Sequence, residues 1–219
     1  MEKRSDCWYK NVCQEECSSA CIRYLEMKYL MDNSNIPKAK QIPQSLIAPK
    51  CDRDAFKFLA GIKSEIVDFV ECGENLYIAS DYTGNGKTSW AIKLMLKYFD
   101  EVWAGNGFRP RALFIHVPTF LLKCKDFNNK DEVFDEMRSL LPTIDLVVWD
   151  DIASTDVSAY DYSQLLMYID ARLLNGLSNI FTGNYSDRSR LEKRVGMKLA
   201  SRIWSDGTRA VVFKGGDMR

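Results

Sequence analysis

The sequence has no long apolar stretch and no apolar segment close behind its N-terminus. A helix that crosses a membrane needs about 18 consecutive apolar residues, and no run in this chain approaches that length. A secretory signal needs an apolar core after a charged start, whereas Met1 to Asp6 is charged and no such core follows. Both absences predict a cytoplasmic protein.

An excess of either charge is also absent. The 30 lysines and arginines balance the 30 acidic residues, so net charge alone does not favour nucleic acid as a partner. Residues 188–219 are an exception, with nine basic residues against three acidic ones. This basic segment fits an anionic partner and equally a solvated surface. The only histidine, His116, is assigned no role, because a lone histidine at a strand end is more often a packed side chain.

Residues 75–89 are the most informative stretch of the chain. They read NLYIASDYTGNGKTS, the pattern of a strand, a glycine-rich loop and the start of a helix. Backbone N–H groups of such a loop, together with the helix N-terminus, bind phosphates. Within this loop Lys87 is expected to reach the β- and γ-phosphates, and the Thr88 hydroxyl to bind Mg²⁺. The predicted ATP-binding residues are Tyr82, Thr83, Gly84, Asn85, Gly86, Lys87, Thr88, Ser89 and Asp150.

One position departs from the phosphate-loop pattern G-x-x-x-x-G-K-[ST], which has glycine where this chain has Asp81. A carboxylate there repels phosphate unless its side chain points away. The alternative interpretation is a glycine-rich turn followed by a chance Lys-Thr pair. The strand before the loop and the helix after it favour the phosphate loop.

The second half of a nucleotide site is expected about 60 residues further on. There the apolar strand 144–151 ends in two carboxylates, Asp150 and Asp151. We expect Asp150 to bind Mg²⁺ together with Thr88, and Asp151 to polarise the attacking water. Asn184 ends a later strand and either senses the γ-phosphate or is an asparagine favoured by a turn.

Four of the seven cysteines lie close to the N-terminus, at Cys7, Cys13, Cys17 and Cys21. A cysteine cluster in a cytosolic chain is typical of a metal site, and four thiolates suit tetrahedral zinc. On one continuous helix, Cys13 and Cys21 would lie about 12 Å apart, which is too far for two ligands of one zinc ion. A zinc site therefore requires the helix to begin or break within this stretch. An iron–sulfur cluster and free cysteines on a buried helix face are the alternatives.

Apolar periodicity predicts alternating helices and strands. Helices are expected over residues 55–70, 87–98, 119–125, 132–141, 160–174, 188–195 and 197–204, and strands before the phosphate loop and over 112–117, 144–151, 178–182 and 209–214. Ile22, Leu25, Tyr29 and Leu30 predict a further helix before residue 32. Prolines and a shortage of large apolar side chains predict a linker over 32–50. The chain thus divides into a cysteine-rich module (1–31), this linker and an α/β domain (51–219).

The short helix expected over 119–125 carries Phe120, Lys123 and Lys125. An aromatic ring beside lysines can hold single-stranded nucleic acid by base stacking and phosphate contacts. From these residues alone, a plain amphipathic helix is the favoured interpretation.

Taken together, the motifs resemble those of AAA+ ATPases of the bacterial and phage helicase-loader type, the DnaC/DnaI family. The resemblance rests on residues 82–88 (YTGNGKT), 147–151 (VVWDD), 181–185 (FTGNY), 199–203 (LASRI) and 213–219 (FKGGDMR), and it covers roughly residues 42–219. The order and spacing of the five motifs are more specific than any one of them. The resemblance implies a three-layer P-loop fold of the ASCE type, with a parallel sheet in the strand order 5-1-4-3-2.

The resemblance also implies roles for single residues. Asn184 matches sensor I, Arg202 the arginine finger that completes the site of a neighbouring subunit, and Arg219 the sensor II arginine. The helix with Lys123 and Lys125 matches the one that contacts single-stranded DNA. The cysteine-rich module is similar to the zinc-binding, helicase-interacting domain of some loaders, although its spacing differs. The implied partners are a replicative helicase, single-stranded DNA and further copies of the chain in a ring or spiral.

The sequence departs from the family pattern at Asp81, at Asp151, where most AAA+ enzymes have glutamate, and after the fifth strand, where we expect no C-terminal helical lid. Without a lid, nucleotide is held mainly between subunits, so we expect weak ATP binding and slow hydrolysis by the isolated monomer. The expected function is ATP-dependent loading of a replicative helicase onto single-stranded DNA. The alternatives are an IstB-type transposition helper, a non-hydrolysing adaptor disabled by Asp81, and a small-molecule phosphotransferase, for which no segment supplies an arginine-rich lid.

Overall fold

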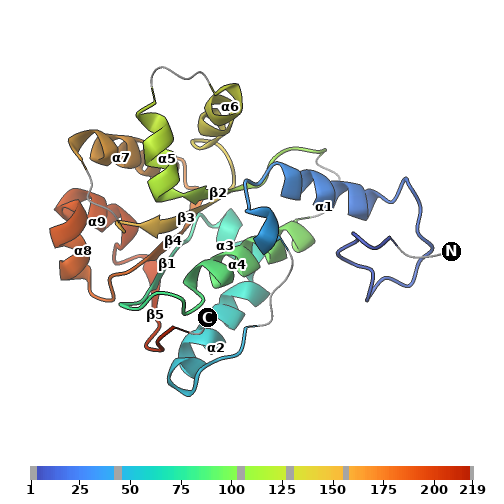
Figure 1. The fold of residues 1–219 in the computed structure, drawn as a ribbon, viewed down its shortest axis with the longest axis horizontal. Coiled ribbons are helices and arrows are strands. Elements are labelled where there is room, and N and C mark those ends of the chain that lie inside the picture. The colour runs from blue at the N-terminus through green and yellow to red at the C-terminus, as the bar shows by residue number, and fades with distance from the viewer. Residues whose placement is uncertain (1–3, 42–45, 103–106, 127–130, 155–157, 218–219) are drawn as a thin grey trace.

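Five parallel strands form the centre of the molecule (Figure 1). The computed structural model describes residues 4–41, 46–102, 107–126, 131–154 and 158–217. The strands are β1 Asn75–Ala79, β2 Ala112–His116, β3 Leu146–Ile152, β4 Ser178–Gly183 and β5 Thr208–Val212. Their order across the sheet is β2-β3-β4-β1-β5. This is the order 5-1-4-3-2 read from the other edge, so the predicted sheet is confirmed.

Helices cover both faces of the sheet, which is the middle of three layers (Figure 1). One face carries α1 Ile22–Asp32, α2 Arg53–Ser64, α3 Ile66–Glu71 and α4 Lys87–Glu101. The other carries α5 Val117–Cys124, α6 Glu132–Leu140, α7 Ala159–Leu174, α8 Arg188–Val195 and α9 Met197–Ile203. Alternate strand residues face the two layers, so in β1 Ile78 packs toward α1–α4 and Tyr77 toward α5–α9. Within the part of the chain that the structure describes, no helix is long and apolar enough to cross a membrane.

The segment predicted as a linker packs against the edge of the sheet. It contains the 3₁₀ turn η1 Lys38–Lys40, and the turn η2 Lys50–Asp52 begins at its end. The backbone N–H of Phe114 in β2 donates to the carbonyl of Ser34 at 2.8 Å, and the Asn35 side chain donates to the Phe114 carbonyl at 2.9 Å. These contacts satisfy backbone groups that the edge strand would otherwise expose. The domain boundaries at residues 31 and 50 stay predictions.

Two helix predictions are wrong in detail. In α1 the buried face consists of Tyr24, Met27, Leu30 and Met31, whereas Ile22 is 60% exposed and Leu25 is exposed as well. Met27, Leu30 and Met31 belong to the apolar core, so this side of the helix faces the protein, and the Tyr24 hydroxyl donates to the Asp6 carboxylate at 2.6 Å. The single helix expected over 55–70 is interrupted at Glu65, whose φ of −118° and ψ of 28° lie outside the helical region.

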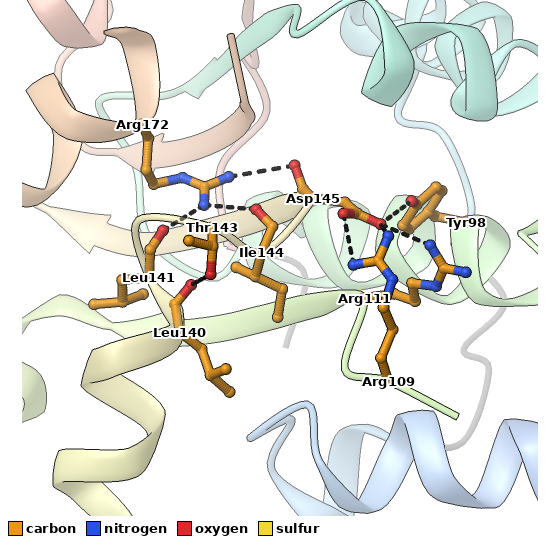
Figure 2. A network of polar contacts seen from close by, with 9 residues as sticks. All are labelled: Tyr98, Arg109, Arg111, Leu140, Leu141, Thr143, Ile144, Asp145 and Arg172. Atoms are coloured by element: carbon orange, nitrogen blue, oxygen red, sulfur yellow. Dashed lines mark hydrogen bonds and ion pairs between the residues drawn. The ribbon is translucent and has the colours of Figure 1, made fainter. Parts of the chain in front are cut away.

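A buried arginine holds the end of the sheet opposite the phosphate loop (Figure 2). Arg172 of α7 is 0% exposed, and its guanidinium donates to the carbonyls of Leu141 (2.6 Å), Ile144 (2.8 Å) and Ser178 (2.6 Å). Its Nε donates to the Asn179 side chain at 2.7 Å. Burial lowers the pKa of Arg172 to about 9, which leaves it charged at neutral pH. Arg172 thus fixes the turn that leads into β3.

Candidate nucleotide-binding site

The predicted phosphate loop connects β1 to α4 at the carboxyl edge of the sheet. Gly84 and Gly86 have φ angles of 71° and 92°, a conformation that strains residues with a side chain. Gly86 directly precedes α4, a helix of 15 residues. The loop therefore leads into a helix N-terminus, where unpaired N–H groups and the helix dipole favour an anion.

Lys87 lies inside the loop. Its side-chain ammonium donates to the backbone carbonyl of Tyr82 at 2.7 Å and to the Asn85 side chain at 3.3 Å. Lys87 is only 8% exposed. Burial lowers its pKa, and the carboxylates of Asp151 and Asp150 act in the opposite direction. A buried cation surrounded by loop backbone is suited to bind phosphate oxygens.

The Asp81 carboxylate points away from the loop. It accepts hydrogen bonds from the backbone N–H and the hydroxyl of Ser186, at 3.2 and 2.6 Å, and from Arg190 at 2.7 Å. These hydrogen bonds from Ser186 and the charge of Arg190 hold the pKa of Asp81 below its usual value. The carboxylate is thus engaged with residues after β4, which is the condition under which it does not obstruct phosphate.

Asp150 and Thr88 lie side by side, as the sequence predicts. The hydroxyl of Thr88 is hydrogen-bonded to the Asp150 carboxylate, which also accepts the hydroxyl of Thr182 at 2.8 Å. Burial raises the pKa of Asp150, and these two hydrogen bonds partly offset that effect. The pair presents a hydroxyl and a carboxylate oxygen, the ligand types that Mg²⁺ prefers.

Asp151 is aimed by a local irregularity in β3. Its φ is 60°, which is unusual for a residue with a side chain, and the register between β3 and β4 shifts between Trp149 and Ile152. The Asp151 carboxylate accepts a hydrogen bond from the Asn184 side chain at 3.2 Å. The structure therefore brings together Asp151 of β3 and Asn184, which directly follows the neighbouring strand β4.

Two residues beside the acid pair were not recognised in the sequence. Thr182 donates its hydroxyl to Asp150 and accepts the Asp151 backbone N–H at 2.9 Å, so it fixes both acids. His116 ends β2 directly opposite Asp150. A polar residue inside the apolar strand 178–183 was the available signal for Thr182. For His116 the signal was its place at the end of a strand parallel to the acid strand.

The C-terminal segment lies against the phosphate loop. The buried Asn85 side chain donates to Ser80 at 2.5 Å and to the carbonyl of Gly215 at 3.3 Å. Asp52, next to α2, accepts the backbone N–H groups of Lys214 and Gly215 at 2.6 and 3.0 Å. Gly215 thus contacts both Asn85 of the phosphate loop and Asp52, which directly precedes α2. The predicted sensor II residue, Arg219, lies outside the described residues.

Arg202 lies on α9 and forms an ion pair with Asp170 of α7 at 2.5 Å. Its side chain is 42% exposed, so it is accessible at the surface. Its assignment as an arginine finger stays a prediction.

The proposed DNA contacts on α5 need one correction. Phe120 is 3% exposed and packs against Phe134, Trp149 and Tyr168, so its ring is not available to stack on a base. Burying the ring of Phe120 among these side chains removes apolar surface from water, which is more favourable than exposing the ring on the helix surface. Lys123 and Lys125 remain at the surface, in ion pairs with Asp131 and Asp161 at 2.7 Å each.

The metal site predicted at the four N-terminal cysteines is not seen in the part of the chain that the structure describes. In the described ranges, which include Cys7, Cys13, Cys17 and Cys21, no three His, Cys, Asp or Glu side chains converge on a point that could hold a metal ion. Instead Cys7 and Cys13 pack against the apolar core. The helix begins only after Cys21, which directly precedes its first residue. The predicted zinc module is therefore not supported, and neither is an iron–sulfur cluster.

A cavity of about 310 Å³ lies on the side of α4 away from the acid pair. Trp8, Met27, Ile92 and Leu96 line it together with Lys63 and Lys93. Among the predicted nucleotide-binding residues only Ser89 borders this cavity, so it is separate from the site described above.

The residues at the carboxyl edge fit ATP and Mg²⁺. The glycine loop and Lys87 supply backbone donors and a cation for phosphates, and Thr88 with Asp150 supplies oxygen ligands for the metal. Asp151 and Asn184 lie next to them. The sheet order is the one that the sequence predicts for a three-layer P-loop fold.

Solved structures with this fold include helicase loaders. A crystal structure of the DnaC helicase loader matches with a TM-score of 0.65 and 20% identity over 81% of this chain and 100% of that chain. A crystal structure of DnaI matches with a TM-score of 0.63 and 15% identity over 85% of this chain and 95% of that one. The replication initiator DnaA bound to AMPPCP and single-stranded DNA matches with a TM-score of 0.58 and 16% identity, over 84% of this chain and 49% of DnaA. No family profile and no curated protein sequence matches the chain.

Proposed function

We propose that this protein is an ATP-dependent loader that places a replicative helicase on single-stranded DNA. The observation that carries the proposal is the assembled edge of the sheet, where Lys87, the Thr88–Asp150 pair and the Asp151–Asn184 pair lie together in a fold shared with DnaC and DnaI. The fold alone is compatible with other AAA+ functions. The polar side chains at the carboxyl edge of the sheet favour an ATPase, because they are the residue types that nucleotide hydrolysis requires.

The side chains divide the chemistry among them. Lys87 exchanges its contacts with Tyr82 and Asn85 for phosphate oxygens, and Thr88 with Asp150 holds Mg²⁺. Asp151, oriented by Asn184, polarises the attacking water. ATP would supply the phosphoanhydride bond that is broken, and Mg²⁺ held by Thr88 and Asp150 would partly neutralise the charge on its phosphates.

A neighbouring copy of the chain completes the site in this proposal. Arg202 is exposed on α9, where it can reach an adjacent subunit once its ion pair with Asp170 opens. Such an arginine stabilises the charge that develops during phosphoryl transfer. The isolated monomer therefore binds nucleotide weakly and hydrolyses it slowly.

Lys123 and Lys125 are the proposed DNA contacts, and phosphates replace the carboxylates with which they now pair. Zinc forms no part of the proposal, because the N-terminal cysteines do not converge. Residues 1–31 remain the segment that we propose to contact the helicase.

The decisive measurement is light scattering after size-exclusion chromatography of the protein mixed with a hexameric replicative helicase, with and without a non-hydrolysable ATP analogue. A complex with several copies per hexamer supports the loader, and Lys87→Ala should remove its dependence on nucleotide. Self-assembly on DNA without helicase binding favours the IstB-type transposition helper. Partner binding with no ATPase in the wild type, unchanged in Lys87→Ala, favours the adaptor.

A further inference from the structure

The side chain of Asp81 joins the first position of the phosphate loop to the segment that follows β4. Three donors converge on its carboxylate: the backbone N–H of Ser186 at 3.2 Å, the Ser186 hydroxyl at 2.6 Å and Arg190 at 2.7 Å. Glycine, which the phosphate-loop pattern has at this position, could make none of these contacts. The contact is therefore a property of this chain.

The segment that Asp81 holds contains a residue of the acid site. Asn184, two positions before Ser186, donates to the Asp151 carboxylate at 3.2 Å. Between them, the carbonyl of Tyr185 accepts the Tyr77 hydroxyl at 3.1 Å. Residues 184–186 are thus fixed at three consecutive positions, by Asp151, by β1 and by the phosphate loop.

The same contact reaches the helices that carry Arg202. Arg190 lies in α8, and α8 is followed by α9 after a single residue, Gly196. Leu191 of α8 and Leu199 of α9 belong to one apolar cluster, so the two helices are packed as a unit. Asp81 therefore links the phosphate loop to α8 and, through the packing of the two helices, to α9.

We propose that Asp81 is a positioning residue for hydrolysis, holding the Asn184 segment against Asp151, and that Arg190 compensates its charge so that the loop can accept phosphate. This rests on the proposed ATPase function. The two roles predict different effects. Loss of Asp81 alone releases the segment and leaves the Arg190 cation, which attracts phosphate, whereas loss of Arg190 alone leaves an uncompensated carboxylate that repels it.

The test compares nucleotide affinity, measured with a fluorescent ATP analogue, and turnover in a set of variants. Asp81→Ala should lower kcat about tenfold or more and should not weaken nucleotide binding. Arg190→Ala should weaken nucleotide binding roughly tenfold, the order expected for one partly exposed charge. Adding Asp81→Asn to Arg190→Ala should restore affinity, because the charge is then removed.

Arg188→Ala is the matched control. Arg188 lies in the same helical turn and pairs with Glu192 and Asp206 rather than with the loop. It should change neither affinity nor kcat. A double variant that binds nucleotide as weakly as Arg190→Ala would overturn the charge compensation, and an unchanged kcat in Asp81→Ala would overturn the positioning role.

Hydrogen exchange without nucleotide separates this inference from the proposed function. Asp81→Ala should accelerate exchange of the Ser186 amide and of residues 187–190, whereas Arg188→Ala should not accelerate it at Ser186. If the wild type neither binds nor hydrolyses ATP but shows this pattern, the contact stands and the ATPase proposal fails. Unchanged exchange at Ser186 in Asp81→Ala refutes the contact itself.

Discussion

The carboxylate of Asp52 accepts the backbone N–H of Gly215 at 3.0 Å, and so joins the start of the α/β domain to the end of the chain. It also accepts the N–H of Lys214 at 2.6 Å, and Asp52 is 1% exposed. Both N–H groups lose their partner if the carboxylate is removed. Because the carbonyl of Gly215 accepts from Asn85, this junction also supports the phosphate loop.

We expect Asp52→Ala to lower the free energy of unfolding by about 3 kcal/mol, since two hydrogen bonds to a charged group are lost. Gly215→Ala should destabilise as well, because an added Cβ would lie 2.7 Å from the Asp52 carboxylate. Gly216→Ala is the control, with nothing within 4 Å of the added Cβ. Urea denaturation measures all three, and equal stabilities of the two glycine variants would contradict the expected clash.

Arg172 predicts a large effect on stability and none on catalysis. In Arg172→Met the carbonyls of Leu141, Ile144 and Ser178 stay buried without their donor, which should cost about 3–5 kcal/mol. The exposed Arg188→Met, whose ion pairs lie at the surface, should cost about 1 kcal/mol or less. Thermal unfolding separates the two. Per folded molecule, ATP turnover should be unchanged in Arg172→Met, because Arg172 lies at the far end of the strands from Asp150.

The sheet and the acid site were predictable because short sequence patterns specify them. The glycines before Lys87 indicate a phosphate loop, and an apolar strand that ends in Asp150 and Asp151 indicates an acid site. Each pattern is contained within a few consecutive residues. The placement of Asp81 was not predictable, since its partner Arg190 lies 109 residues away. Nothing in the local sequence shows which way that carboxylate points.

Burial explains the wrong assignments. Phe120 was grouped with Lys123 and Lys125 because they are close in the sequence, but its ring faces Trp149 and Tyr168 from other elements. The cysteine spacing allowed a metal site, whereas the fold uses Cys7 and Cys13 in apolar packing. The sequence assigned no role to Arg172, because its acceptors are backbone carbonyls that no sequence pattern reveals.

The raised pKa of Asp150 predicts a pH dependence of Mg²⁺ binding. Only the ionised carboxylate is a metal ligand, and burial makes this group keep its proton to a higher pH than an exposed aspartate does. Mg²⁺-dependent nucleotide affinity should therefore fall as pH is lowered through this raised value. The stability of the metal-free protein should depend on pH in the opposite direction. Because the pKa of Asp150 is higher in the folded than in the unfolded protein, this group contributes most to stability below its unfolded-state pKa. That contribution is lost as pH rises through its folded-state pKa. Calorimetric titration with Mg-ATP at several pH values measures the binding, and Asp150→Asn should lose the dependence.

Lys123 gives a test of the DNA surface. Its ion pair with Asp131 is half exposed and contributes little to stability, so Lys123→Ala should fold normally. If Lys123 contacts one phosphate, the slope of log affinity for single-stranded DNA against log salt should decrease by about 1. Lys57→Ala, exposed on α2, should leave the slope unchanged. Lys125→Ala is less suitable for this test, because it would leave the buried carboxylate of Asp161 without its cationic partner and so would also affect stability.

Mixing two inactive variants tests whether Arg202 acts on a neighbouring subunit. Lys87→Ala keeps the arginine but cannot bind phosphate, and Arg202→Ala keeps an intact loop but lacks the arginine. In an equal mixture assembled on single-stranded DNA, about a quarter of the interfaces combine an intact loop with an intact arginine, so about a quarter of wild-type ATPase should return. Asp170→Ala, which removes only the partner of Arg202 within the same chain, should still complement when it is combined with Lys87→Ala in one chain. Full activity of Arg202→Ala alone, or no recovery in a mixture that demonstrably assembles, would show that Arg202 serves only its ion pair with Asp170.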